Sequence, residues 1–426
     1  MDTRTKNGNN WRKILSLGLS GMGILYFLIQ SFSLGAFWFV NYIDSQTAMS
    51  QTISYGLILW ASIFSGFVLV PVFLLSLYQL KGQDPPKWLD TSRPIFRKIS
   101  YWIIVIWPVV VLIGWFVAGI PTLSAFLLGG INILVAALPI LWVYALATKD
   151  LKRGHAIAQW RIFGFSLIIT PIIIIIAEII ALLILAGVGA LYISYRSSIN
   201  PSFERELMYL YNQISTRQAD VDAVLEIIRP YIFQPSVITW ALVVFAGIVP
   251  VIEEIIKPLA LWSLAGRKIS PQEGFVGGLL SGAGFALMEN VLYFTATISA
   301  MDWLFIALGR AGTGVLHMLA SGLVGWGLAK AWRDGKWIFL AGTTISAIIL
   351  HGLWNAVSLT TGIVSLVSID IELTIWQDLL YSAPTFILLV ISIIGLAWIK
   401  KHFIRKNHSG DAEDYEANTD EPQDIR

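Results

Sequence analysis

The sequence contains no cysteine and few charged residues. Of its 426 residues only 13% are charged, whereas 56% are hydrophobic. The absence of cysteine excludes disulfide bonds, a thiol nucleophile and a cysteine-ligated metal. Soluble domains have about 25% charged residues, so a chain this poor in charge needs the bilayer as its solvent. The formal net charge of +2 is too small to indicate nucleic acid as a partner.

The sequence contains long runs of apolar residues. A bilayer core of about 30 Å is crossed by about 20 apolar helical residues. The first run, which follows Arg12 and Lys13, is longer than the apolar region of about 7–15 residues in a signal peptide. We therefore expect a retained span and an all-α, polytopic helical bundle in the membrane. Ten stretches qualify as spans: 14–40, 52–80, 100–119, 122–147, 162–192, 237–265, 274–298, 303–329, 337–362 and 378–399.

The distribution of Lys and Arg predicts the orientation of these spans. If the N-terminus lies inside, the inner segments hold most of the basic residues. The outer connections then hold only those within 193–236, namely Arg196, Arg205, Arg217 and Arg229. Both termini are therefore predicted to be cytoplasmic.

The spans and their connections divide the chain into four segments: an N-terminal membrane extension of about four spans (1–161), the fifth span with an outer loop (162–236), a segment that carries the candidate site (237–400) and a disordered cytoplasmic tail (401–426). The tail is predicted to be disordered because it is polar and acidic. The outer loop has an amphipathic helical pattern. It fits either a solvated connector or a lid or substrate-docking segment above the site.

Charged residues lie well inside several spans. A charge at the bilayer centre costs about 2.5–3.5 kcal/mol on insertion scales, so such residues must face a protein interior or a wet cavity and pair with one another. The six are Glu178, Glu253, Glu254, Lys257, Glu289 and Arg310. Four consecutive spans carry an ionisable group roughly 20–25 Å from where each span starts, at 1.5 Å per residue. These groups are the Glu253–Glu254 pair, Glu289, His317 and His351. We expect them to converge near mid-membrane.

Each group has a polar neighbour four residues later, on the same helical face. The pairs are Glu253 with Lys257, Glu289 with Tyr293, His317 with Ser321 and His351 with Asn355. Phe285 precedes Glu289 by four residues, and Arg310 precedes His317 by seven. The pattern Gly274, Gly278, Gly282 predicts that this helix approaches a neighbour closely. Any one of these residues could be a packing device, whereas the whole set at one depth favours a site.

Three motifs lie in order on successive spans: Glu253-Glu254-Ile-Ile-Lys257 (EExxK), Phe285-Ala-Leu-Met-Glu289 (FxxxE) and His351-Gly-Leu-Trp-Asn355 (HxxxN). Together, with His317 between the second and third, they resemble the PrsW family of bacterial intramembrane proteases. That family is related to the group containing the CAAX-prenyl endopeptidases and bacteriocin-processing enzymes. The resemblance covers about 237–362 and leaves the first five spans unassigned. PrsW itself has Asp where this chain has Asn355, and Asn is typical of the CAAX-type relatives.

The resemblance implies a glutamate-dependent peptidase without a metal. Glu253 or Glu254 would be the general base, and Glu289 and His317 would help to hold the water. The oxyanion would accept hydrogen bonds from two residues of the last motif, His351 and Asn355. Lys257 would pair with Glu253 or Glu254. The other supporting residues are Phe285, Tyr293, Arg310 and Ser321.

A rival chemistry uses zinc. Two His and two Glu are adequate zinc ligands, and the set available for it is Glu254, Glu289, His317 and His351. No HExxH motif is present, so the sequence does not favour this version. Pro250 and Pro258 flank the EExxK motif, so we expect an irregular helix there.

If the chain is a protease, its partners are the lipid bilayer and a membrane-anchored protein substrate, for which an anti-sigma-factor-like protein would fit. The expected location is a bacterial plasma membrane. Mid-membrane Glu and His are also used by proton-coupled transporters. A transporter, a lipid-interacting protein and a degenerate binding scaffold therefore remain the alternatives.

Overall fold

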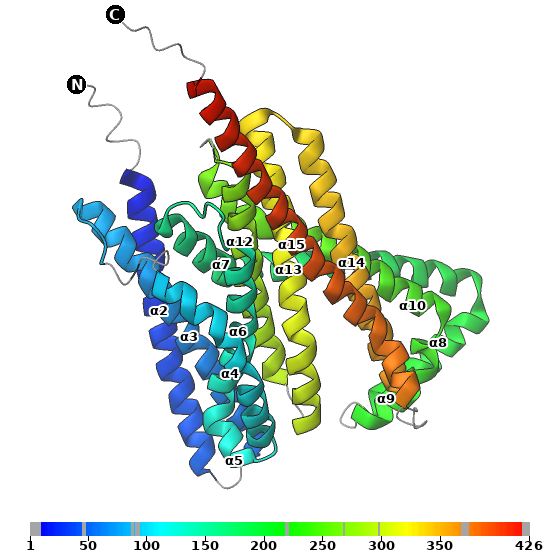
Figure 1. Ribbon diagram of the computed structural model, residues 1–426. Coiled ribbons are helices and arrows are strands. Elements are labelled where there is room, and N and C mark those ends of the chain that lie inside the picture. Colours follow the sequence, from blue (N-terminus) through cyan, green and yellow to red (C-terminus); the bar gives the residue numbers. More distant parts are fainter. Residues whose placement is uncertain are drawn as a thin grey trace, which may run out of the picture. The chain divides into compact units, whose positions relative to one another are not determined.

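The computed structural model describes residues 10–44, 48–86, 89, 94–217, 221–266, 269–296, 299–367 and 375–419. Within these ranges the chain is helical and contains no strand, so the expected all-α class is confirmed (Figure 1). The elements, with π and 3-10 segments labelled η, are α2 (Asn10–Ile43), α3 (Met49–Lys81), α4 (Pro94–Ala118), α5 (Pro121–Leu123), η2 (Ser124–Leu128), α6 (Gly129–Ala147), α7 (Ala156–Ile199), α8 (Pro201–Thr216), α9 (Val221–Ile232), α10 (Pro235–Leu242), η3 (Val243–Ile248), α11 (Val249–Ile256), η4 (Lys257–Leu264), α12 (Pro271–Tyr293), η5 (Phe294–Ala296), α13 (Ala300–Asp334), α14 (Trp337–Val367) and α15 (Ile375–Thr419).

The membrane character of the chain is confirmed by nine helices in its described part that are long and apolar enough to cross a bilayer. They are Lys13–Ile43, Met49–Lys81, Pro121–Ala147, Ala156–Ile199, Pro235–Leu264, Pro271–Tyr293, Ala300–Asp334, Trp337–Ile363 and Ser382–Arg405. A shorter apolar helix, Trp102–Ala118, corresponds to the remaining expected span. The ten helices overlap the ten expected stretches one for one.

The chain divides into two compact units. Unit 1 comprises Met1–Pro171, Lys257–Leu350 and Phe386–Arg426, and unit 2 comprises Ile172–Ile256 and His351–Thr385. The boundaries fall within α7, α14 and α15, and between α11 and η4. The EExxK and HxxxN motifs therefore lie at unit boundaries.

Glycines bring α12 and α13 of unit 1 into backbone contact. A Cβ atom at Gly278 would overlap the carbonyl oxygen of Ser321, and one at Gly282 would overlap that of His317. A Cβ at Gly274 would lie 2.5 Å from the oxygen of Gly325, which is also too close. The close approach predicted from the glycine spacing is confirmed, and it fixes the register of the helices that carry Glu289 and His317.

The N-terminal helices belong to the same compact unit as α12 and α13. The buried indole of Trp303 on α13 donates a hydrogen bond of 2.8 Å to Asn132 on α6. Gly284 on α12 lies against the backbone of α7, where a Cβ would be 2.9 Å from the oxygen of Phe163. Residues before 171 thus pack directly on the helices that carry the second motif and His317.

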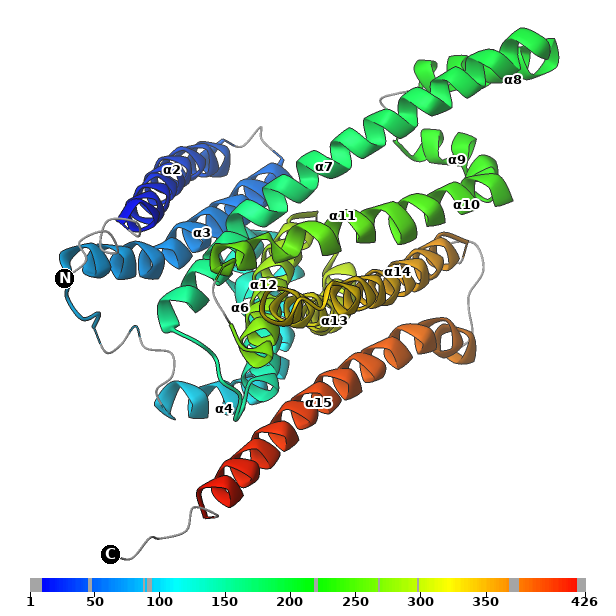
Figure 2. The same ribbon diagram turned by 90° about the horizontal axis from the view of Figure 1, so that it is seen from above.

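Unit 2 contains α8 and α9, which confirm the helical pattern expected for the outer loop. Helix α8 begins where the Asn200 side chain accepts hydrogen bonds from the Ser202 and Phe203 N–H groups, an ordinary N-cap. Within this unit the end of α7 leads into α8, and α9 leads back to α10 (Figure 2). Between α10 and α11 the chain makes the π segment η3.

The irregular helix expected around the EExxK motif is also observed. The π segment η3 ends two residues before Pro250, and the 3-10 segment η4 begins at Lys257, one residue before Pro258. Proline lacks the N–H that a regular helix needs, so a change of winding near each proline is the physical consequence.

The C-terminal segment differs from its prediction. Helix α15 extends to Thr419, whereas the sequence predicted a disordered tail from residue 401. Extending an existing helix costs little because nucleation is already complete and each residue adds one hydrogen bond. Residues 420–426 lie outside the described residues, so disorder there stays a prediction, as do the other segment boundaries and the cytoplasmic placement of the termini.

We predict that Gly278→Ala lowers the thermal unfolding temperature of the purified protein in detergent. Overpacking of this kind costs about 1–3 kcal/mol, because the new methyl group must push α12 away from Ser321. Gly342→Ala is the matched control, since nothing lies within 4 Å of a Cβ there and Ala favours a helix by about 1 kcal/mol over Gly. Equal unfolding temperatures for the two variants would contradict the close packing.

Candidate functional site

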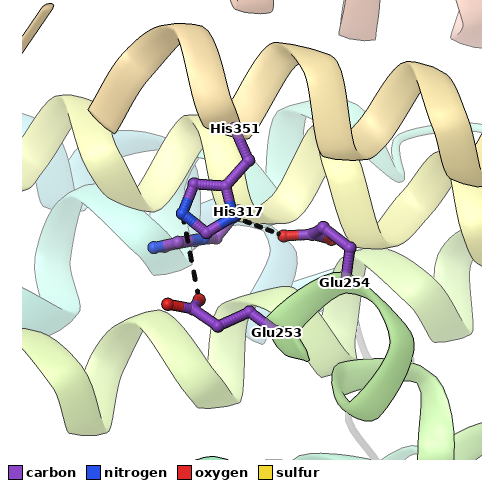
Figure 3. A group of neighbouring side chains, drawn as sticks. All are labelled: Glu253, Glu254, His317 and His351. Atoms are coloured by element: carbon purple, nitrogen blue, oxygen red, sulfur yellow. Dashed lines mark hydrogen bonds and ion pairs between the residues drawn. The ribbon is translucent and has the colours of Figure 1, made fainter. Parts of the chain in front are cut away.

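A buried group of two carboxylates and one imidazole lies in unit 2. Glu253 and Glu254 on α11 are 6% and 0% exposed, and His351 on α14 is 2% exposed. His351 Nδ1 lies 2.9 Å from Glu254 Oε1, and His351 Nε2 lies 3.9 Å from Glu253 Oε2 (Figure 3). An ionised carboxylate only accepts hydrogen bonds, so Nδ1 donates to Glu254. The other ring nitrogen, Nε2, faces Glu253.

Two residues of the HxxxN motif bring α14 close to the chain before α11. A Cβ at Gly352 would overlap the carbonyl oxygen of Ala246. Asn355 Nδ2 donates a hydrogen bond of 2.9 Å to the carbonyl oxygen of Phe245. Gly352 was not recognised from the sequence as a site residue, although a glycine directly after a motif histidine is a usable signal of close backbone approach.

A second polar group lies in unit 1. Lys257 Nζ is 2.8 Å from His317 Nδ1, and His317 Nε2 is 2.9 Å from Glu289 Oε2. An ammonium only donates, so Nδ1 accepts and Nε2 donates to the carboxylate. This pattern describes a neutral imidazole with both nitrogens engaged. The Lys257 ammonium also lies 4.4 Å from the ring centre of Phe285, a cation–π contact.

Arg310 neutralises Glu289 in the same unit. Its Nη2 lies 2.6 Å from Glu289 Oε2, and its Nε donates a hydrogen bond of 2.6 Å to Asn290 Oδ1. Its guanidinium carbon lies 4.2 Å from the ring centre of Tyr293. Asn290 also donates to the carbonyl oxygen of Arg310 at 3.3 Å. Asn290 was missed in the sequence because an amide next to a motif glutamate carries no charge signal.

The residues at four-residue spacing have contacts with other elements. Lys257 contacts His317, Asn355 contacts the backbone of Phe245, and Tyr293 contacts Arg310. Ser321 Oγ is buried and has no hydrogen bond within the described part of the chain. Helical spacing therefore identified the correct faces, but not the partners across helices.

Two buried serines hold the backbone of Lys257. Ser281 Oγ donates a hydrogen bond of 2.6 Å to the Lys257 carbonyl oxygen. Ser166 Oγ lies 2.8 Å from Ser281 Oγ. A serine hydroxyl has one proton, so Ser166 donates in this pair. The two serines connect α7 through α12 to the start of η4, and nothing in the sequence singled them out.

Four residues in the described part of the chain form a group that could hold a metal ion, namely Glu253, Glu254, His317 and His351. This set contains Glu253, whereas the set derived from the sequence contained Glu289. Imidazole nitrogens and carboxylate oxygens are the ligands that zinc takes in catalytic sites. Within unit 2, His351 Nε2 and Glu253 Oε2 lie 3.9 Å apart. Two tetrahedral zinc ligands with bonds of about 2.0–2.2 Å are about 3.3–3.6 Å apart, so a small closing movement would let both atoms bind one ion. The donor set therefore fits zinc.

The chain was compared with known protein families. Residues 207–391 match the model of the PrsW family, described as intramembrane metalloproteases. The resemblance expected from the three motifs is thereby confirmed, and the match extends beyond 237–362 at both ends. No curated protein and no solved structure matches the chain.

The matched segment contains both polar groups described above, including Arg310 and Asn355. The match therefore supports a peptidase among the apolar helices. The match covers less than half of the chain and begins within α8. The described helices before residue 171 lie outside it, yet α6 and α7 pack against α13 and α12 within unit 1.

We predict that Arg310→Met destabilises the protein by about 3 kcal/mol, because it leaves the Glu289 carboxylate inside the protein without its main counter-charge. The double variant Glu289→Gln/Arg310→Met recovers part of this loss, since it removes both charges. Denaturant unfolding in detergent measures the change. Arg333→Met is the control on the same helix, because the Arg333 side chain is 49% exposed. A double variant no more stable than Arg310→Met would contradict the pairing.

Proposed function

We propose that the chain is an intramembrane endopeptidase that hydrolyses a peptide bond of a membrane-anchored protein. The observation that carries the proposal is the buried group of Glu253, Glu254 and His351, which lies within the PrsW-family domain on apolar helices. Peptide hydrolysis needs an activated water and a group that stabilises the oxyanion. This group supplies both a base and an oriented imidazole.

The two carboxylates have different roles in this proposal. Glu254 accepts the hydrogen bond from His351 Nδ1 and so orients the ring, as carboxylates do behind the histidines of hydrolase and metal sites. Glu253 is the general base, since its Oε2 lies on the Nε2 side of the ring at a separation of 3.9 Å. Polar atoms at such a distance suit a water molecule that contacts both. The proton of the attacking water passes to a Glu253 oxygen.

Zinc fits the same residues. Within unit 2, Glu253 and His351 would hold the ion, with Glu254 behind His351. When bound, zinc supplies a Lewis acid that generates a hydroxide near neutral pH and polarises the scissile carbonyl. In unit 1, both ring nitrogens of His317 are already engaged, by Lys257 and Glu289. The family description as metalloproteases supports this version.

Lys257 belongs to the polar group of unit 1, where its ammonium donates to His317. Stabilisation of the oxyanion needs a hydrogen-bond donor beside the activated water. The sequence assigned this role to His351 and Asn355, but Asn355 donates to the Phe245 carbonyl. Glu289 then acts through His317, and Arg310 neutralises Glu289. Phe285 and Tyr293 hold the two cations through their ring faces.

The substrate class follows from the position of the site. Glu253 and Glu254 lie on the candidate span Pro235–Leu264, and His351 lies on the span Trp337–Ile363. The scissile bond must therefore enter the membrane, which a membrane-anchored protein achieves. An anti-sigma-factor-like protein in a bacterial plasma membrane would meet this requirement. The excess of Lys and Arg on one side supports cytoplasmic termini.

Cells that express the native chain are predicted to contain new protein N-termini near the membrane segments of particular proteins. These termini disappear in Glu253→Gln, Glu254→Gln and His351→Ala at matched abundance, because each change removes the base or the orientation of the imidazole. Comparison of protein N-termini between the strains measures this. Glu204→Gln, on the exposed first turn of α8, is the control and leaves the termini unchanged. Identical termini in every strain would contradict a protease and favour a transporter, which flux assays would then test.

Purified protein is predicted to contain about one zinc ion per chain. Removal of the zinc with a chelator lowers cleavage of the substrate by at least about 100-fold, and added zinc restores it. His351→Ala lowers the zinc content as well as the activity. Metal analysis combined with a cleavage assay measures both. Full activity in metal-free protein would contradict the zinc version and leave the glutamate-dependent one.

A further inference from the structure

The π segment before α11 leaves one backbone carbonyl without its usual helical donor. In a π-helix each carbonyl accepts from the N–H five residues later. The Val249 N–H follows this rule and bonds to the Val244 oxygen. The next carbonyl, that of Phe245, would need the N–H of residue 250. Residue 250 is proline, which has no N–H.

The side chain of Asn355 supplies the missing donor. Its Nδ2 donates to the Phe245 oxygen at 2.9 Å. In the hydrocarbon region no water can satisfy such a carbonyl, so a donor from the protein is required. Gly352 assists, because only a residue without Cβ fits against the neighbouring carbonyl of Ala246. One turn of α14 is thus attached to the π segment.

This attachment acts on the site in unit 2. Asn355 lies one helical turn after His351, and Pro250 lies one turn before Glu254. A contact between Asn355 and the Phe245 carbonyl therefore holds the two helices together beside the 2.9 Å hydrogen bond between Glu254 and His351. A shift of one helix along the other would lengthen that bond.

We propose that Asn355 is a positioning residue that replaces the N–H missing at Pro250 and thereby holds Glu254 against His351. The proposal rests on the proposed function of the Glu253, Glu254 and His351 group. It also restricts which side chains can function at position 355. The side chain must be a hydrogen-bond donor, and an ionised Asp, which only accepts, does not meet it.

The test is a double-mutant cycle on the full-length protein. Its members are the native chain, Asn355→Leu, Pro250→Ala and the double variant. Pro250→Ala restores a backbone N–H at residue 250, so the Phe245 carbonyl no longer needs Asn355. The effect of Asn355→Leu is compared within each background, so any effect of Pro250→Ala alone cancels.

We expect Asn355→Leu to lower kcat for the cleaved substrate by about 10–100-fold, with KM changed by less than about threefold. In the Pro250→Ala background the same change costs at least about tenfold less. Asn355→Gln, which keeps a donor, retains more kcat than Asn355→Asp. If Asn355 instead donated to the oxyanion, its loss would cost the same kcat in both backgrounds, and that outcome overturns the proposal. So does an Asp variant as active as the Gln variant.

The unfolding temperature provides a readout that does not depend on catalysis. The loss caused by Asn355→Leu is expected to be smaller in the Pro250→Ala background, because the Phe245 carbonyl has a donor there. If the native chain cleaves nothing while this coupling persists, the proposed function fails and the link between Asn355 and Pro250 stands. Equal losses in both backgrounds would overturn the link itself.

Discussion

The structure depends on one constraint: inside a bilayer, a charged or polar group must find its partner within the protein. The buried ionisable side chains of the motifs follow this rule in both units. Glu254 accepts from His351 in unit 2. In unit 1, Lys257, His317 and Glu289 form a continuous chain of contacts that ends at Arg310. The same contacts that remove unpaired charge also orient each imidazole, so stability and chemistry have a common origin.

The constraint applies equally to the backbone. Pro250 removes a donor from the helix before the two glutamates, and Asn355 replaces it from another helix. Glycines also help to position the helices, since Gly278 allows the backbones of α12 and α13 to come into contact. Side chains that carry no charge therefore contribute to the position of those that do. This is why the motifs contain glycine and asparagine beside the ionisable residues.

Much of the fold could be predicted from the sequence, because span length and apolar composition directly reflect the bilayer thickness. The common depth of Glu253 and His351 also followed from helical rise alone. Their partners did not. Spacing along one helix suggested a Glu253–Lys257 pair, yet the hydrogen bond of Lys257 to His317 crosses to another helix. Neutral groups such as Ser281 give no signal in a single sequence, because their role depends on which carbonyl the fold brings near them.

The most direct test of the account is the tautomer of His351, since the Glu254–His351 hydrogen bond underlies the roles of both glutamates. Nitrogen NMR of metal-free protein labelled at histidine reports which ring nitrogen carries the proton, and the His351→Ala variant assigns the signal. The account predicts a neutral ring protonated at Nδ1, with this proton signal altered in Glu254→Gln and preserved in Glu204→Gln. A ring protonated at Nε2 alone, unaffected by Glu254→Gln, would contradict it.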